Sequence, residues 1–257
     1  MRLALLLVAC AVAVGGCGGD DEPDPFAYDP GTPLAVRVLG EQGGGGVNIA
    51  DVSYAAAGGS VQAFAVRPRG PGPFPVVLFQ HGGGSSRSDF LDEAAALAER
   101  GAFGILVQAP ERPSVRGGVV ANVLAWRRAL DWVDEQNILD PSRIAFVGIS
   151  YGAGIGADLA GADDRVGTYV LMSGPPRWRD AGADDVDPAR WVARAKDARF
   201  LFQLGRLDDV VPPAEGKELV DAAPEPKETR RYDAGHVLDA QAQRDRVEWL
   251  STALGLG

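Results

Sequence analysis

The feature that most constrains the fold is the regular alternation of strand-like and helix-like segments from Phe74 to the C-terminus. The runs FPVVLF (74–79) and RIAFVG (143–148) are apolar at nearly every position, which is typical of strands buried on both faces. Between them, residues 119–137 have apolar side chains at helical spacing. Strands that alternate with helices form right-handed βαβ units, so the sequence predicts an α/β fold with a mostly parallel, doubly wound sheet.

The chain ahead of this alternating part has a different pattern. Residues 34–67 alternate polar and apolar side chains between glycine-rich turns, so we expect antiparallel strands at the front of the sheet. Further on, residues 174–198 separate two expected strands, and they are too few for a large cap domain. Trp178 and Trp191 in this segment either line a binding site or pack against the sheet.

The N-terminus has the features of an export signal. Met1 and Arg2 give a basic start, and the apolar stretch 3–14 is shorter than the about 20 residues that span a bilayer. We therefore expect a signal peptide over residues 1–16. Small residues directly before Cys17 resemble the lipobox of bacterial lipoproteins, which implies a lipid on Cys17 and a place in the bacterial cell envelope. Ordinary secretion is the alternative.

The residues that follow predict a tether and then one domain. Residues 17–33 are rich in Asp, Pro and Gly and poor in apolar side chains, so we expect a lipid-anchored, disordered tether and a folded domain over 34–257. Of the two cysteines, Cys10 lies in the signal and Cys17 at its end. The folded domain therefore relies on its apolar core and not on a disulfide.

Charge and composition exclude several classes of partner. The net charge is −10 and no cluster of Lys or Arg occurs, which argues against nucleic acid and anionic lipid headgroups. Membrane contact is expected through the lipid anchor only. With two histidines far apart, no metal site is expected. The GAGIGA segment (152–157) matches part of a dinucleotide fingerprint, but it lies within the expected helix, so no cofactor is expected.

Side chains able to do chemistry follow four of the expected strands. In chain order these are His81 with Gly82 to Gly84, Ser150 within GISYG (148–152), the pair Asp208 and Asp209, and His236. The chain has only two histidines, and both lie at the end of a strand. Because ligands bind at the carboxyl ends of parallel strands, we expect these groups to lie close together.

Ser150 lies between an apolar strand and a helix of small residues. That is the context of a nucleophile elbow, in which the residues two before and two after the serine, here Gly148 and Gly152, must be small. The plainer alternatives are a turn that happens to contain a serine, an aspartate that caps the next helix, and a surface histidine.

The order serine, acid, histidine, with the segments DPSRIAFVGISYGA and GRLDDVVP, resembles the α/β-hydrolases. The most similar branch includes the dienelactone hydrolases, the acetyl esterases and the catalytic domain of prolyl oligopeptidases. The resemblance covers about residues 34–257 and implies the α/β-hydrolase fold. The family's acid motif, Gly-x-x-Asp-x-x-Val-Pro, begins at Gly205 and selects Asp208 over Asp209. The dienelactone hydrolases proper have cysteine in place of Ser150, so their specific activity is not expected.

The resemblance also implies roles for the site residues. Ser150 would attack the substrate, His236 would take its proton, and Asp208 would orient the imidazole.

An oxyanion hole is expected beside this triad. The backbone N–H groups of Tyr151 and Gly83 would form it, with Gly84 or Gly82 as alternatives to Gly83. His81 is expected to hydrogen-bond this loop rather than to react.

The expected activity is that of a serine hydrolase. The first candidate is a carboxylesterase that acts on small to medium acyl esters, either small molecules or esters borne on a polysaccharide. The alternatives are a peptidase of the prolyl-oligopeptidase type and a non-catalytic binding lipoprotein. Peptidases of that type usually carry a further N-terminal domain, and only about 40 residues lie between the expected tether and the first buried strand.

Overall fold

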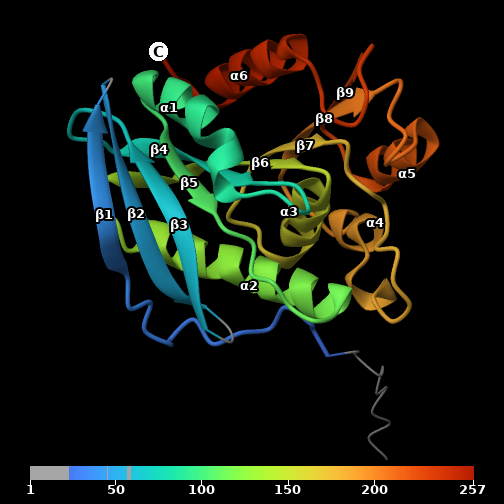
Figure 1. Ribbon diagram of the computed structural model, residues 1–257, viewed down its shortest axis with the longest axis horizontal. Helices are drawn as coiled ribbons and strands as arrows, with labels where there is room; N and C mark the ends of the chain where they lie inside the picture. The colour runs from blue at the N-terminus through green and yellow to red at the C-terminus, as the bar shows by residue number, and fades with distance from the viewer. Residues whose placement is uncertain (1–22, 45, 57–58) are drawn as a thin grey trace, which may run out of the picture.

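The computed structural model describes residues 23–44, 46–56 and 59–257, in which helices cover both faces of one sheet (Figure 1). The expected signal peptide and Cys17 lie outside the described residues. Within the described ranges, no helix is both long and apolar enough to cross a membrane.

The sheet contains nine strands in the described part of the chain. They are β1 (Arg37–Gly44), β2 (Val47–Ala56), β3 (Gly59–Arg67), β4 (Phe74–Gln80), β5 (Phe103–Val107), β6 (Leu139–Ile149), β7 (Thr168–Met172), β8 (Arg199–Gly205) and β9 (Lys227–Tyr232). The helices are α1 (Leu91–Glu99), α2 (Val115–Asp134), α3 (Tyr151–Ala162), α4 (Pro188–Val192), α5 (Pro213–Ala222) and α6 (Ala240–Leu254), with short 3₁₀ turns at Arg87–Phe90 and Asp184–Val186.

The strand order is β1-β2-β3-β5-β4-β6-β7-β8-β9. Strands β1, β2 and β3 pair antiparallel with one another in turn, and β3 pairs antiparallel with β5. All the remaining neighbours in the sheet, from β5 through β4, β6, β7 and β8 to β9, pair parallel. The predicted fold class, a mostly parallel doubly wound sheet with antiparallel N-terminal strands, is therefore confirmed. From β4 the chain moves to β5 on one side and then to β6 on the other. Ligands of such sheets bind where the order reverses, so a site is expected beyond the ends of β4 and β6.

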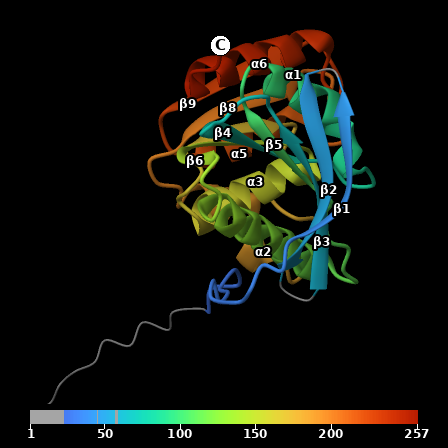
Figure 2. The ribbon, with the colours of Figure 1, turned by 90° about the vertical axis from the view of Figure 1, so that its left-hand side faces the viewer.

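Two apolar layers hold the helices against the sheet. On one face, α1 and α6 contribute Leu97 and Leu250 to a core with strand residues such as Val77 and Val147. On the other face, α2, α3 and α5 pack on the larger core, in which Trp126 and Phe146 are in edge contact at 5.3 Å between ring centroids. The side view shows α1 and α6 together above the sheet and α2 and α3 below it (Figure 2). The buried strands are thus apolar on both faces, as their sequence indicated.

The segment between β7 and β8, residues 173–198, contains only a 3₁₀ turn and the five-residue helix α4. It forms no large cap domain, as expected. Its two tryptophans are structural, since both are buried and both indole N–H groups donate to backbone carbonyls, Trp178 to Val186 and Trp191 to Asp185. The packing alternative for these side chains is therefore the correct one.

The expected disorder of the tether is wrong from Pro23 onward. Phe26 is completely buried, and its ring meets that of Trp191 edge-on at 4.5 Å between centroids. Composition suggested a flexible segment because it contains few apolar residues, but its one phenylalanine is inserted into the core. The folded domain therefore begins about ten residues earlier than position 34.

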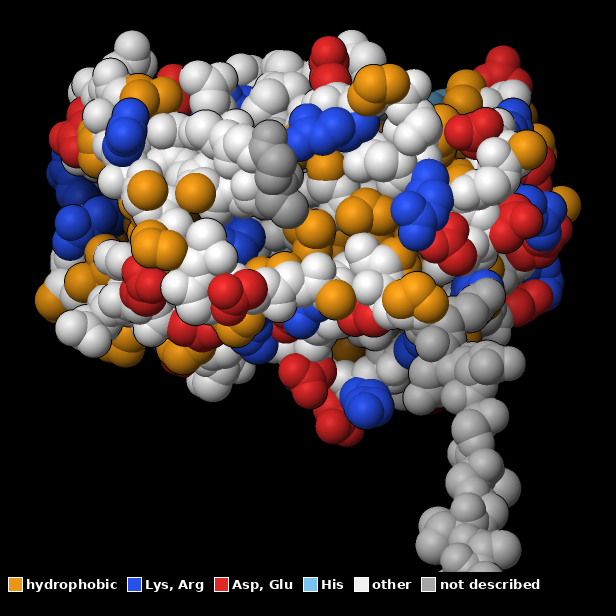
Figure 3. Space-filling view, turned by 90° about the horizontal axis from the view of Figure 1, so that it is seen from below, with side chains coloured by type: hydrophobic (Ala, Val, Ile, Leu, Met, Phe, Trp, Pro, Cys, Tyr) orange, Lys and Arg blue, Asp and Glu red, His pale blue; other side chains and the backbone are white. Residues whose placement is uncertain are grey.

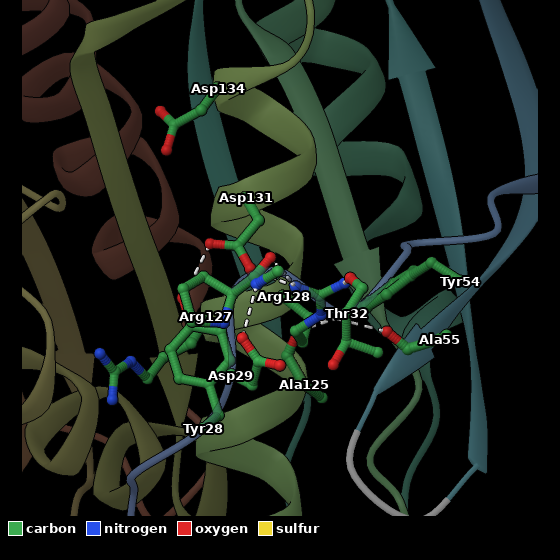
Figure 4. A network of polar contacts seen from close by, with 12 residues as sticks. Tyr28, Asp29, Thr32, Tyr54, Ala55, Ala125, Arg127, Arg128, Asp131 and Asp134 are labelled. Carbon is green, nitrogen blue, oxygen red and sulfur yellow. Dashed lines mark hydrogen bonds and ion pairs between the residues drawn. The ribbon is translucent and has the colours of Figure 1, made fainter.

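Polar side chains of α2 hold the same segment along the helix (Figure 4). The bonds are Arg127 Nη1 to the Phe26 carbonyl (2.7 Å), Arg128 Nη1 to the Pro30 carbonyl (3.2 Å), Arg128 Nη2 to the Thr32 carbonyl, and the Tyr28 hydroxyl to Asp131 (2.8 Å). These arginines satisfy backbone carbonyls that no sheet or helix would otherwise pair. On the surface seen from below, acidic and basic side chains are interspersed around apolar ones, without a continuous basic face (Figure 3).

A buried ion pair joins the two helices of the other face. Arg246 of α6 donates to Glu93 of α1 with two nitrogens, Nε to Oε1 at 2.7 Å and Nη2 to Oε2. Both residues are less than a tenth exposed. Removal of one partner leaves a buried charge without its counterion, which is costlier than loss of a surface pair.

We therefore predict that Arg246→Ala lowers the free energy of unfolding by about 3 to 5 kcal/mol. Lys217→Ala, which breaks an exposed pair with Asp221 on α5, is the matched control and should cost about 0.3 to 0.5 kcal/mol. Urea titrations followed by circular dichroism measure both. Equal losses in the two variants would show that the buried pair does not connect α1 to α6 as described.

Candidate active site

Ser150 occupies a strained turn between β6 and α3. Its backbone has φ 54° and ψ −118°, a left-handed conformation that serine rarely adopts. The turn is held by a hydrogen bond from the Ser150 N–H to the Met172 carbonyl, at 2.8 Å, on the neighbouring strand β7. A strained residue that the surrounding structure fixes in this way is a candidate for function.

The glycines on either side of Ser150 are required by close backbone contacts. A Cβ atom on Gly152 would lie 2.3 Å from the Gln80 carbonyl oxygen and 2.7 Å from that of His81, at the end of β4. A Cβ atom on Gly148 would lie 2.3 Å from the Gly152 carbonyl oxygen. The start of α3 thus rests directly on the end of β4. This is the crowding that the sequence pattern of the elbow predicted.

Asp208 and His236 are in direct contact. His236 Nδ1 lies 2.9 and 3.0 Å from the two carboxylate oxygens of Asp208. Oδ1 of Asp208 also accepts from the backbone N–H groups of Val210 and Val211. A carboxylate only accepts, so Nδ1 carries the proton and Nε2 of the neutral ring is an acceptor. Asp209, the alternative acid, is exposed.

The backbone of His236 is tied to the strand end beside Ser150. The hydroxyl of Ser173 donates to the His236 carbonyl at 3.0 Å, and Ser173 directly follows Met172, the acceptor of the Ser150 N–H. Among the described residues, the Ser150 hydroxyl and the His236 imidazole form no hydrogen bond with each other. The structure therefore brings Asp208 and His236 into direct contact and places Ser150 at the adjacent strand end.

The glycine loop after β4 lies against the elbow. A Cβ atom on Gly82 would be 3.7 Å from Cβ of Ser150, and one on Gly83 would be 3.7 Å from Cβ of Tyr151. Gly84 has φ +72°, which glycine adopts without strain. The residues proposed as oxyanion donors thus lie beside the serine and its successor.

His81 hydrogen-bonds this loop, as expected. Its Nδ1 lies 2.7 Å from the Gly82 carbonyl oxygen, and its Nε2 accepts from the Ala109 N–H at 3.0 Å. Because both ring nitrogens have partners and the side chain is buried, His81 fixes the loop and has no nitrogen left for a substrate.

Sequence reasoning missed two polar residues that support the site. One is Ser173, which has φ 49° and a buried side chain. The other is Asn122 of α2, whose Nδ2 donates to the Gly118 carbonyl and lies 3.1 Å from the Tyr151 hydroxyl. A lone amide within the apolar run VVANVLAW was the available signal for Asn122. Burial raises the pKa of the Tyr151 hydroxyl, so it stays protonated at neutral pH.

In the described part of the chain, no group of three or more His, Cys, Asp or Glu side chains is arranged to hold a metal ion.

Comparison with known proteins identifies relatives of this architecture. The model of the alpha/beta hydrolase family matches residues 76–254, which include Ser150, Asp208 and His236. An uncharacterized protein of Mycobacterium tuberculosis (strain ATCC 25618 / H37Rv) is 31% identical over 202 residues, which cover 68% of this chain and 69% of that protein.

Solved structures of hydrolases are similar in fold. An acetyl xylan esterase from Paenibacillus sp. R4 superposes with a TM-score of 0.76 at 22% identity, over 86% of this chain and 89% of that one. A puromycin-hydrolyzing peptidase of Mycobacterium tuberculosis superposes with a TM-score of 0.65 at 17% identity, over 84% of this chain and 47% of that one. These likenesses show the fold.

The close approach of Gly152 to the end of β4 predicts that a larger residue at this position lowers the stability of the protein. Alanine is the better helix former by about 1 kcal/mol, but a Cβ at 2.3 Å from a backbone oxygen forces the start of α3 away from β4. We expect Gly152→Ala to lower the free energy of unfolding by about 1 to 3 kcal/mol. Gly167→Ala, where a Cβ would meet nothing within 4 Å, should leave stability nearly unchanged. A Gly152→Ala protein as stable as the native chain in urea would contradict the described packing.

Proposed function

Because the chain belongs to the alpha/beta hydrolase family, we propose that it is a serine hydrolase that cleaves carboxylic esters with small to medium acyl groups. The observation that carries the proposal is the strained turn of Ser150 at the strand end next to the Asp208–His236 pair. A serine in this turn is exposed at the top of the sheet, where a base can reach its proton.

In the proposed reaction, Ser150 Oγ attacks the ester carbonyl and His236 Nε2 takes the hydroxyl proton. Asp208 holds the ring with Nδ1 protonated and stabilises the positive charge that forms on it. The two backbone N–H groups that bind Asp208 keep its carboxylate in place during this step. As the C–O bond breaks, Nε2 returns the proton to the leaving alkoxide. Water then repeats the sequence on the acyl-enzyme and releases the acid.

The oxyanion of each tetrahedral intermediate needs donors that are already in place. We assign these to the N–H groups of Tyr151 and Gly83, with Gly84 as the alternative to Gly83. The Tyr151 ring is fixed by Trp178, at 5.2 Å between centroids, and its hydroxyl by Asn122. The glycine loop is fixed by His81. Fixed dipoles of this kind need no reorganisation when charge develops.

The absence of a large cap domain over residues 173–198 supports acyl esters of small molecules or of a polysaccharide as substrates. Among the solved structures of similar fold is an acetyl xylan esterase, which is consistent with short acyl groups. A peptidase of similar fold keeps cleavage of aminoacyl amides as the second candidate.

We predict that a fluorophosphonate probe labels Ser150 and that Ser150→Ala removes the label together with all ester hydrolysis above background. Ser142→Ala, a change at an exposed serine of β6, should keep both. Mass spectrometry of the labelled peptide locates the adduct. An unlabelled native protein would favour a non-catalytic binding protein. Faster cleavage of aminoacyl anilides than of p-nitrophenyl acetate would favour the peptidase.

The contact of Asp208 with His236 predicts different effects at the two neighbouring acids. Asp208→Asn should lower kcat about 10⁴-fold, because the amide no longer holds the required tautomer of His236. Asp209→Asn changes an exposed side chain and should alter kcat by less than about twofold. Steady-state kinetics on p-nitrophenyl acetate measure both. A larger loss at Asp209 would show that the acid has been assigned to the wrong residue.

A further inference from the structure

Three exposed apolar side chains lie on the two loops that carry Asp208 and His236. Seven large apolar residues are exposed among the described residues, and three of them belong to these loops. They are Leu207, 71% exposed, Val210, 50% exposed, and Val237, 78% exposed. Leu207 directly precedes Asp208, and Val237 directly follows His236. We call these three residues the apolar rim.

Backbone contacts hold the two loops side by side. The Leu207 N–H donates to the Ala234 carbonyl at 3.0 Å, and a Cβ atom on Gly235 would lie 3.8 Å from the Leu207 carbonyl oxygen. The Val210 N–H binds the Asp208 carboxylate, which in turn binds His236. The three residues of the apolar rim therefore belong to two loops whose backbones contact each other beside the Asp208–His236 pair.

Folding does not require these side chains to be apolar. Single exposed apolar residues are common on protein surfaces, but a group of them beside a reactive centre indicates a binding surface. Two arginines that belong to or contact these loops already have carboxylate partners. Arg179, which donates to the Val210 carbonyl, also binds Glu215, and Arg206 binds Asp233. The surface beside His236 thus offers apolar contact and arginines that already have a carboxylate partner.

We propose that the apolar rim binds the alcohol part of the ester, so that the enzyme prefers esters of apolar alcohols. This inference rests on the proposed function. His236 Nε2 must protonate the leaving alkoxide oxygen, so that oxygen lies within about 3 Å of the imidazole. The carbon chain bonded to it then begins beside His236 and runs over the loops that bear Leu207 and Val237. The acyl group is bonded to Ser150, at the other end of the scissile bond.

The experiment compares kcat/KM for methyl, propyl, butyl and hexyl acetate. The acyl group is constant and the alkyl alcohols are of similar acidity, so differences report contact with the alcohol chain. A half-buried methylene contributes about a twofold change, so we expect kcat/KM to rise about twofold for each added methylene. The double variant Leu207→Ser/Val237→Ser should flatten this rise. A urea unfolding midpoint close to that of the native chain shows that this variant is folded.

Two control variants separate binding from disturbance of the loops. Val38→Ser changes a residue of β1 that is 59% exposed, and it should keep the rise with alcohol length. Leu207→Met/Val237→Ile keeps apolar side chains on both loops and should also keep the rise. In all variants, the dependence on acyl length, measured with methyl acetate, butyrate and hexanoate, should be that of the native chain.

The possible outcomes distinguish failure of this inference from failure of the proposed function on which it rests. If the native enzyme hydrolyses no ester, the proposed function fails. If it hydrolyses all four acetates with equal kcat/KM, or an acetylated methyl xyloside faster than hexyl acetate, the function stands and the inference is wrong. A flat series together with loss of phosphatidylcholine vesicle binding in the double serine variant would instead make the apolar rim a lipid-docking surface.

Discussion

The close contact between the start of α3 and the end of β4 is the constraint on which the rest of the site depends. At Gly152 the helix backbone lies where a Cβ would be 2.3 Å from the Gln80 carbonyl oxygen. Only a glycine at this position lets the chain turn sharply enough to leave Ser150 at φ 54°. The same contact brings the glycine loop after β4 beside Ser150 and Tyr151. The proposed nucleophile and its expected oxyanion donors are therefore positioned by the same backbone contact.

The rest of the site follows from the order of the strands. Because β6 and β7 are neighbours, the end of β7 contacts both the serine turn, through Met172, and the histidine loop, through Ser173. The acid loop after β8 and the histidine loop after β9 are joined by the Asp208–His236 contact. Residues from four segments far apart in sequence thus reach one edge of the sheet, and none of them depends on a cap domain for its position.

Much of this arrangement could be predicted from sequence. The spacing of apolar residues indicates which faces are buried, and space for a side chain is absent where glycines stand on both sides of Ser150. The strand before His81, the long helix α2 and the small residues around Ser150 are examples. Contacts between residues far apart in sequence leave no local pattern of this kind. Phe26 stands in a segment with the composition of a linker, and nothing local shows that Arg127 and Arg128 bind its carbonyls. The strand β1 continues through Gly44, within one of the glycine-rich stretches of residues 34–67 that were expected to be turns, because pairing with β2 uses the backbone alone.

The proposed activity requires that His236 accepts the proton of the Ser150 hydroxyl once a substrate is bound. A crystal structure of the chain after reaction with diethyl p-nitrophenyl phosphate tests this most directly. We predict a phosphoryl group on Ser150, its oxygen within about 3 Å of the N–H groups of Tyr151 and Gly83, and His236 Nε2 at hydrogen-bond distance from an oxygen of the adduct. An adduct on Ser150 with His236 turned away, or with the phosphoryl oxygen directed elsewhere, would contradict the account.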